Sequence, residues 1–235
     1  MNNYLTLILF VLVLSLPQPV AAEAVKLRHF GSIYSDADGS ALLEPAGVSY
    51  RDPLLLVADS GSKSILSYRY QQGEVVPVAR YELPGKFPLQ VQQVKSGEMY
   101  VLDGRDRQIL ILDVNGRIKG SFSPKQMPDN RRMVPRSFRI TADGSILLLD
   151  IFAERVLLFD AAGVFRRQLP VPQPYGALAD VVMDDAGNIF LLDSVTAIVY
   201  RAAPEVTEFT ALTESMKESM NFPTSMAVDG QGRLF

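Results

Sequence analysis

The sequence predicts an all-β fold built from a repeated unit, either a propeller or a solenoid array, on three observations. First, a pattern of apolar strand, tight turn, second apolar strand and Asp recurs along the chain, most clearly as VVMDDAGNIFLLD at 181–193. Second, the terminal Asp residues stand at 59, 103, 150 and 193, and a regular period of this length marks propellers and solenoids. Third, no segment from 25 to 205 has the 3.6-residue period of a helix. A further copy, MAVDGQGRLF, begins at 226.

Each unit divides into four short strands, because apolar or alternating runs are broken at regular intervals by Gly, Asp, Pro and Asn. Gly in the turn between first and second strands supplies the positive φ that a tight hairpin needs. We expect strands at about 46–50, 54–58, 64–70 and 74–82; 89–94, 98–102, 108–112 and 117–122; 136–140, 145–149, 155–159 and 164–169; and 178–183, 188–192, 197–201 and 206–212.

The recurrent Asp after each second strand has a structural interpretation. A short carboxylate accepts hydrogen bonds from the backbone N–H groups of its own turn and so holds the next hairpin in register. Metal binding or catalysis is the alternative. The runs LLLVAD, SILLLD and IFLLD are apolar on both faces, as expected for strands buried between neighbouring sheets.

Proline and the chain ends complete the repeat pattern. Pro45, Pro88, Pro135 and Pro223 precede first strands closely, and proline suits a loop entering a sheet edge. Residues 25–33 are expected to form a lone outer strand that closes the ring. The segment ESMKESM at 214–220 is expected to form a helical turn or two, with its methionines on one face as packing residues.

Composition excludes several functional classes. The chain is 48% hydrophobic and 21% charged with a net charge of -3, which fits a globular domain without general attraction to nucleic acid or anionic membranes. There is no Cys, which excludes disulfides and thiolate chemistry, and no Trp. His29 is the single His of the sequence, which excludes most classes of histidine-based catalysis and most zinc sites.

The N-terminus is typical of an export signal. An uncharged apolar run at 5–16 is followed by PQP and then by Val20-Ala21-Ala22, with small residues where a signal peptidase cleaves. We predict a signal peptide at 1–22 and a mature protein in the periplasm or outside the cell. An uncleaved anchor is the alternative, although twelve apolar residues are short of the roughly 20 that span a bilayer.

The repeats resemble the NHL repeat family, most clearly in LLLDIFAERVLLFDAAG at 147–163. Arg155 matches the family's basic residue five positions after the Asp, whereas Asp106, Ser62 and Thr196 replace its usual Asn in other copies. The resemblance covers nearly all of 41–235 and implies a β-propeller, most often six-bladed, of four-stranded antiparallel sheets.

The chain differs from a complete family member at its C-terminus, because the repeat that starts at 226 stops before its Asp. We therefore expect four complete blades plus the start of a fifth, as part of an incomplete six-bladed ring. A gene product without a separate role is one alternative. The expected blades are 41–83, 84–123, 135–170 and 174–212, with a partial blade at 222–235.

Three local motifs have a functional and a structural interpretation. Ser60-Gly61-Ser62-Lys63 matches the S-x-x-K pattern of penicillin-recognising hydrolases, but it lies in a predicted hairpin turn. The segments at 36–40 and 184–188 are rich in oxygen ligands, yet neither has the spacing of an EF-hand loop. Turn chemistry is the expected role of all three, and His29 is expected to be solvated or capping.

The most uneven charge lies between Arg117 and Arg139, where seven basic residues meet only one acid, Asp129. Loops between blades form one face of a propeller, and Arg side chains there suit carboxylate or phosphate ligands. A solvated loop is the alternative. We predict that Arg131→Glu with Arg132→Glu lowers affinity for an acidic partner and flattens its salt dependence. The candidate ligand-binding residues are Arg131, Arg132, Arg136, Arg107 and Arg155.

These observations predict an exported, non-enzymatic propeller that binds a protein, peptide or acidic glycan through its inter-blade loops. We expect no cofactor, no metal, no nucleic acid and no membrane association after signal cleavage. The alternative is a divalent-metal-dependent propeller enzyme resembling lactonases or lyases, in which Asp, Glu and Asn side chains hold one ion.

Overall fold

The computed structural model describes residues 29, 31–129 and 132–235, and its secondary structure is entirely β. The chain separates into a short unit that ends at Ser32 and a unit from Ile33 to Phe235, which contains every strand. The second unit is a propeller of four antiparallel, four-stranded blades, which confirms the predicted fold class. The part of the chain that the structure describes contains no helix of the length and apolar character that a membrane span requires.

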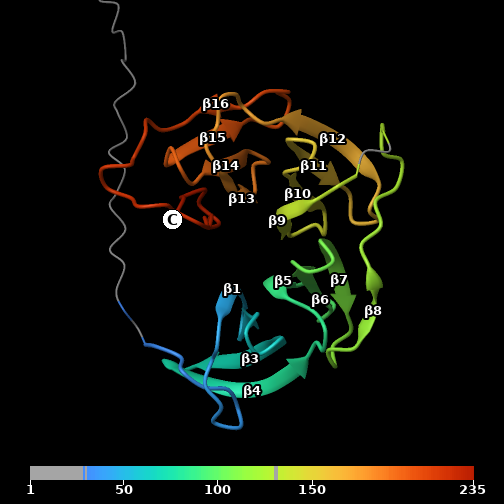
Figure 1. The fold of residues 1–235 in the computed structure, drawn as a ribbon, viewed down its shortest axis with the longest axis vertical. Helices are drawn as coiled ribbons and strands as arrows, with labels where there is room; N and C mark the ends of the chain where they lie inside the picture. Colours follow the sequence, from blue (N-terminus) through green and yellow to red (C-terminus); the bar gives the residue numbers. More distant parts are fainter. Residues whose placement is uncertain (1–28, 30, 130–131) are drawn as a thin grey trace, which may run out of the picture. The chain divides into compact units, whose positions relative to one another are not determined.

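The strands of each blade follow one another in sequence from the centre outwards (Figure 1). The first strands, β1, β5, β9 and β13, are innermost, and β4, β8, β12 and β16 are outermost. Blade 1 comprises β1 (Pro45–Arg51), β2 (Leu54–Asp59), β3 (Ser64–Gln71) and β4 (Glu74–Glu82); blade 2 comprises β5 (Pro88–Gln93), β6 (Met99–Asp103), β7 (Gln108–Leu112) and β8 (Ile118–Ser121); blade 3 comprises β9 (Pro135–Ile140), β10 (Ile146–Asp150), β11 (Arg155–Phe159) and β12 (Phe165–Pro170); blade 4 comprises β13 (Leu178–Met183), β14 (Ile189–Asp193), β15 (Ile198–Ala202) and β16 (Thr210–Ala211).

Each of the sixteen strands expected from the sequence is present, and most agree within one residue at either end. The exception is β16, which is much shorter than the expected 206–212. Pro204 and the turn that follows it delay pairing until Thr210, which lies opposite Arg201.

Apolar faces of adjacent blades form the core. The doubly apolar second strands supply both faces, so that Leu147 and Leu149 contact blade 4 while Ile146 and Leu148 contact blade 2. A third cluster joins blades 1 and 2. Burial on both sides explains why these strands lack the polar alternation of a solvent-facing sheet.

The recurrent Asp residues act as the sequence predicts and also do more. Asp193 is fully buried and accepts hydrogen bonds from the amides of Val195 and Thr196 in its own turn, at 3.0 and 3.3 Å. It also accepts from Gly176 and Ala177, which precede β13, at 2.8 and 2.9 Å. The carboxylate therefore ties the start of its blade to the turn between β14 and β15. The same two-sided pattern occurs at Asp59, Asp103 and Asp150.

Residues 226–235 form a hairpin beside blade 4. Ala227 and Phe235 exchange two backbone hydrogen bonds, and Val228 forms an isolated bridge with Leu234. Met226, Val228 and Leu234 contact the apolar face of blade 4 that points away from blade 3. This hairpin occupies the place of the expected fifth repeat, while the six-bladed ring stays a prediction.

Three predictions concern the segments around the blades. The signal peptide at 1–22 lies outside the described residues, as do 25–28 and 30 of the expected outer strand, and its remaining residues are not in a strand. The segment 214–220 forms one turn, closed by a hydrogen bond from Met220 N to Met216 O at 2.8 Å. Met216 packs against the blade 4 cluster, whereas Met220 is exposed, so the methionines do not share one packed face.

Candidate ligand-binding channel

The four innermost strands place equivalent residues toward the centre of the propeller. Next to the start of each first strand the pairing shifts by one residue, a β-bulge that turns the following side chain. The residue after the shift pairs with the position just before the recurrent Asp. The residues at this position, which we call the upper tier, are Gly47, Gln90, Ser137 and Asp180.

The upper tier forms a chain of hydrogen bonds from blade to blade. Gln90 Nε2 donates to Ser137 Oγ at 3.4 Å, and Ser137 Oγ donates to Asp180 Oδ1. Asp180 Oδ2 accepts from the amide of Met226 at 2.8 Å, which extends the chain to the C-terminal hairpin. Ser137 and Asp180 are fully buried, so these bonds satisfy groups that water does not reach.

A second set of contacts satisfies the open edges of the innermost strands. Such an edge carries N–H groups that have no partner within its own blade. Gln90 Oε1 accepts from Phe138 N at 3.2 Å, and Gln92 Oε1 accepts from Ile140 N at 2.6 Å. Glutamine side chains of blade 2 therefore stand in for a neighbouring strand of blade 3.

Arg139 is the cation at the centre of this network. Its Nη2 donates to Asp180 Oδ2 at 2.6 Å and to Met226 O at 3.3 Å, and Nη1 donates to Phe138 O at 2.9 Å. The Arg139 side chain keeps 20% of its surface exposed, whereas Asp180 keeps 1%. The buried carboxylate is thus neutralised, while the Arg139 side chain stays partly exposed at the cavity walls.

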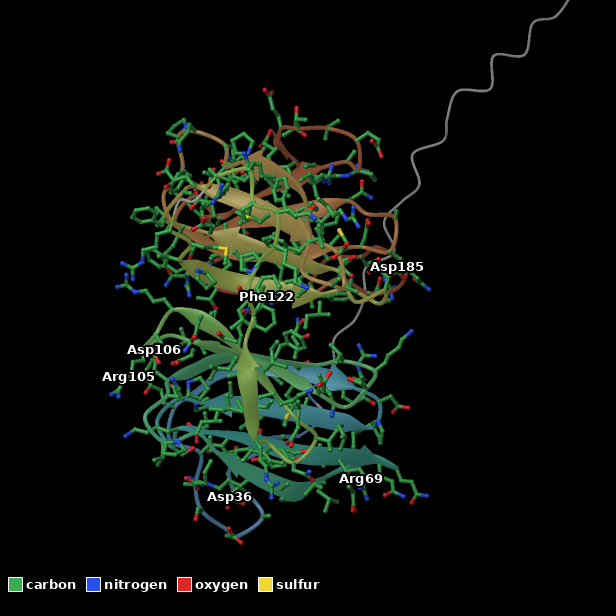
Figure 2. All side chains as sticks on the ribbon, turned by 90° about the vertical axis from the view of Figure 1, so that its right-hand side faces the viewer. Asp36, Arg69, Arg105, Asp106, Phe122 and Asp185 are labelled. Atoms are coloured by element: carbon green, nitrogen blue, oxygen red, sulfur yellow. The ribbon has the colours of Figure 1, made fainter. Side chains whose placement is uncertain are left out.

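Two adjoining cavities lie beside Arg139. The larger has a volume of about 840 Å³ and the smaller about 750 Å³, and they share Val48, Gln92, Arg139, Met226 and Ala227 in their walls. Volumes of this order are typical of small-molecule sites. Figure 2 places Arg105 and Asp106 on one side of the blades and Asp185, from the wall of the smaller cavity, on the opposite side.

Arg136 contributes a second cation to the larger cavity. It is exposed, and within the described part of the chain it makes no hydrogen bond or ion pair. No Asp or Glu among the described residues lines this cavity. Arg136 therefore gives the larger cavity a net positive charge in a chain whose net charge is -3, because the charge of Arg139 is balanced by Asp180.

The structure separates the other predicted binding residues. Arg131 lies outside the described residues, and Arg132 is exposed one position further along the same loop. Arg107 is exposed in the turn between β6 and β7, with a left-handed φ of 55°. Neither Arg132 nor Arg107 lines one of the two cavities.

Arg155 has a structural place that the prediction of a binding role did not anticipate. Only 2% of its surface is exposed, although it is among the largest side chains in the core. Its Nε donates to Asp150 Oδ2 at 3.2 Å, and Nη1 donates to Asp129 and Gln168, both at 2.9 Å. Since these partners occupy the guanidinium, Arg155 stabilises blade 3 and is not available to a ligand.

The local motifs follow their structural interpretations. Ser62 Oγ donates to Asp59 Oδ2 at 2.7 Å inside the β2–β3 turn, where Lys63 has a left-handed φ. Asp36 and Asp184 accept hydrogen bonds from their own turns, and Asp36 also pairs with Arg80. Among the described residues no group of three or more His, Asp or Glu side chains is placed to hold a metal ion.

Sequence reasoning missed most of the channel. Gln90, Gln92, Ser137 and Asp180 were not selected, and Arg139 was noted only as part of a basic segment. The available signal was positional, because Gln90 and Ser137 each stand two residues after the Pro that opens a first strand. Aligning the first strands by the recurrent Asp would have placed these side chains in one tier.

Comparison with known proteins identifies the fold. No protein-family model and no curated protein matches the chain. The structure is similar to the selenomethionine-substituted virginiamycin B lyase from Staphylococcus aureus, with a TM-score of 0.59 and 15% identity over 81% of this chain and 62% of that one. The structure of a catalytically inactive histidine-to-alanine variant of the S. aureus lyase, with quinupristin, is similar as well. Its TM-score is 0.59 and its sequence identity is 16%, over 81% of this chain and 62% of that one.

A protein of unknown function from Bacteroides caccae is also similar, with a TM-score of 0.54 and 19% identity over 78% of this chain and 64% of that one. The chain thus spans less than two thirds of the length of each of these structures. At such identities the likeness concerns the fold: the chain folds as a β-propeller similar to that of the lyases.

Proposed function

We propose that this propeller binds a carboxylate-bearing ligand, an acidic peptide or an acidic glycan, in its central channel. The observation that carries the proposal is the lining of the larger cavity. Arg136 and Arg139 line it, and no Asp or Glu among the described residues does. Apolar residues, Gln90, Gln92, Thr224 and Ser225 supply the rest of its wall.

The two arginines suit a carboxylate for different reasons. Arg136 keeps its full set of guanidinium donors for a ligand, because no described residue accepts from it. Arg139 is held in place by Asp180 and keeps one side exposed. A planar guanidinium binds a carboxylate through two parallel hydrogen bonds, and such charge-assisted bonds are stronger in a partly enclosed site than in water.

Titration calorimetry with a glutamate hexapeptide and an oligogalacturonate tests the proposal. We expect Arg136→Gln to weaken the better-bound probe about tenfold and to flatten its salt dependence, as the loss of one close ion pair requires. Arg105→Gln is the matched control, because Arg105 is exposed on another blade and does not line the cavity. Binding of neither probe to the native chain, or equal affinity in the two variants, would contradict the proposal.

A second candidate is a lyase-like activity, which the fold similarity to virginiamycin B lyase favours. A histidine-to-alanine variant of that lyase is catalytically inactive. The only histidine of this chain is His29, which is exposed, hydrogen bonded to Ser32 at 3.3 Å, and located in the unit before Ile33. A histidine-dependent reaction would therefore require this residue.

Chromatography of quinupristin incubated with the purified chain, combined with metal analysis, tests this candidate. Conversion that is lost on chelation, with a stoichiometric divalent ion, would support a metal-dependent enzyme. Unchanged quinupristin and no bound metal would leave the binding function as the better account.

A further inference from the structure

We infer that the smaller cavity is a sugar-binding subsite in which the ring of Tyr50 forms the stacking face. This inference deepens the proposed function and rests on it, because it assigns the acidic ligand to the glycans. It is carried by an exposed, positioned aromatic ring at a cavity wall that also holds uncommitted donors and acceptors.

Tyr50 is both exposed and fixed. It lines the smaller cavity from β1, and 53% of its surface is open. The ring meets Tyr70 edge to face, with centroids 6.3 Å apart, and the Tyr50 hydroxyl donates to Asp52 Oδ1 at 2.8 Å. This hydrogen bond also raises the pKa of Tyr50. A ring held at its edge and at its hydroxyl loses little freedom when a ligand stacks on it.

The polar groups of the cavity match sugar hydroxyls, which donate and accept at once. Gln92 lines the cavity, and its Oε1 is committed to Ile140 N, so its Nε2 donors have no partner within the described chain. Within the described chain, Ser49 Oγ and the exposed carboxylate of Asp185 have no hydrogen-bond partner. Nε2 donates, the carboxylate accepts and the serine hydroxyl does both, which is the mixture that a ring of hydroxyls requires.

The two cavities differ in charge, because Arg136 and Arg139 line the larger one, whereas the smaller one is lined by Arg139 and by the carboxylates of Asp143, Asp184 and Asp185. An acidic sugar fits this pair if its carboxylate lies at the arginines and the hydroxyls of a sugar ring lie at Tyr50. The cavities share Gln92 and Arg139 in their walls, so an oligosaccharide that occupies both would extend from Tyr50 to Arg136. Its carboxylates would meet the two arginines, while a sugar ring lies on Tyr50. An acidic peptide can satisfy the arginines, but it presents no ring of hydroxyls to the face of Tyr50.

The test compares two substitutions of one residue by titration calorimetry on the full chain with oligogalacturonate. Tyr50→Ala removes the stacking face, and we expect it to weaken binding about five- to twentyfold. Tyr50→Phe keeps the ring and loses only the bond to Asp52, so affinity should stay within about twofold. Asp185→Ala, an exposed position with little influence on folding, should weaken binding about threefold.

A glutamate hexapeptide and a neutral galactan of matched length separate the possible outcomes. Weaker oligogalacturonate binding in Tyr50→Ala, with hexapeptide binding unchanged, supports the sugar subsite. Equal oligogalacturonate affinity in Tyr50→Ala and Tyr50→Phe, with Asp185→Ala also unchanged, overturns it. If the native chain binds the hexapeptide but not oligogalacturonate, the sugar inference fails while the proposed function stands, and if it binds neither acidic probe, both fail.

Discussion

The turns that hold the recurrent Asp residues and the upper tier at the centre of the propeller belong to the same repeats, yet they differ in one respect. The Asp is the same in every blade, is fully buried, and accepts hydrogen bonds from two sides of its turn. The upper tier instead holds Gly, Gln, Ser and Asp in the four blades. Repetition thus marks what each blade needs to fold, and variation marks where the blades meet one another.

The physical reason is that a blade's internal geometry repeats while its surroundings at the centre do not. Every blade must bind the start of its first strand to its second turn, and one carboxylate does this in the same way each time. At the centre, each innermost strand faces a different neighbour. Gln92 accepts from a backbone amide, whereas Arg139, at the equivalent position of blade 3, pairs with a buried carboxylate.

The largest expected effect comes from breaking a repeated turn. Asp150→Ala should lower the free energy of unfolding by about 3–5 kcal/mol, because it leaves Arg155 buried with one partner lost and three backbone amides unsatisfied. Asp113→Ala is the matched control, since Asp113 accepts two amides in a surface turn and should cost about 0.5–1.5 kcal/mol. Urea denaturation measures both, and equal losses would show that burial is not what makes the recurrent Asp important.

A somewhat smaller effect is expected at the channel position of blade 1. A Cβ at Gly47 would lie 2.5 Å from Leu89 O and 3.0 Å from Gln90 Cα, so Gly47→Ala must push blades 1 and 2 apart. We expect a loss of about 1–3 kcal/mol. Gly120→Ala is the control, because a Cβ there would lie more than 4 Å from every atom outside Gly120 and its two chain neighbours, and its free energy of unfolding should change by less than about 0.5 kcal/mol. Thermal unfolding measures both variants. If Gly47→Ala leaves the free energy of unfolding unchanged, blades 1 and 2 can accommodate a Cβ at this position of the upper tier.

Acid should weaken the turns that the recurrent Asp residues hold together. Burial alone would raise the pKa of Asp193, but the amides of Gly176 and Ala177 outweigh it and the pKa is lowered. The pKa of Asp59 is lowered for the same reason, with Ser62 as the strongest donor. Because both folded pKa values lie below the ordinary 3.8, this stability is complete above about pH 4 and is lost as pH falls through the folded values.

Unfolding free energies measured from pH 6 to pH 2 test this dependence. Asp193→Asn, which cannot titrate, should be less stable at neutral pH and should show a shallower decline in acid. An unchanged acid slope in this variant would assign the decline to other carboxylates.

The smallest effect on stability is expected at Arg136, because substitution there should weaken ligand binding and leave folding nearly unchanged. Arg136→Gln should change the free energy of unfolding by less than about 0.5 kcal/mol, because the side chain is exposed and has no described partner. Circular dichroism melting would measure this beside the binding experiment. A loss above that limit would give Arg136 a structural role like that of Arg155.

Particular residues show how far the sequence alone could lead. Asp59 and Asp193 were assigned correctly because their hydrogen bonds are mostly local and a turn motif describes them. Arg155 was misjudged as a ligand residue because its partner Asp129 lies in a loop 26 residues earlier, and no local pattern brings the two together. Asp180 was missed for the same reason, since its partners Ser137, Arg139 and Met226 come from other blades and the C-terminal hairpin.

The sequence by itself determined the all-β repeat, the sixteen strands and the buried Asp of each turn, because these depend on apolar alternation and hydrogen bonds within one unit. Only the tertiary structure decided which cations are free and which are neutralised. Whether an arginine such as Arg136 or Arg155 meets open space or a carboxylate depends on how successive blades are placed around the centre, and that placement is set by packing between units far apart in the chain.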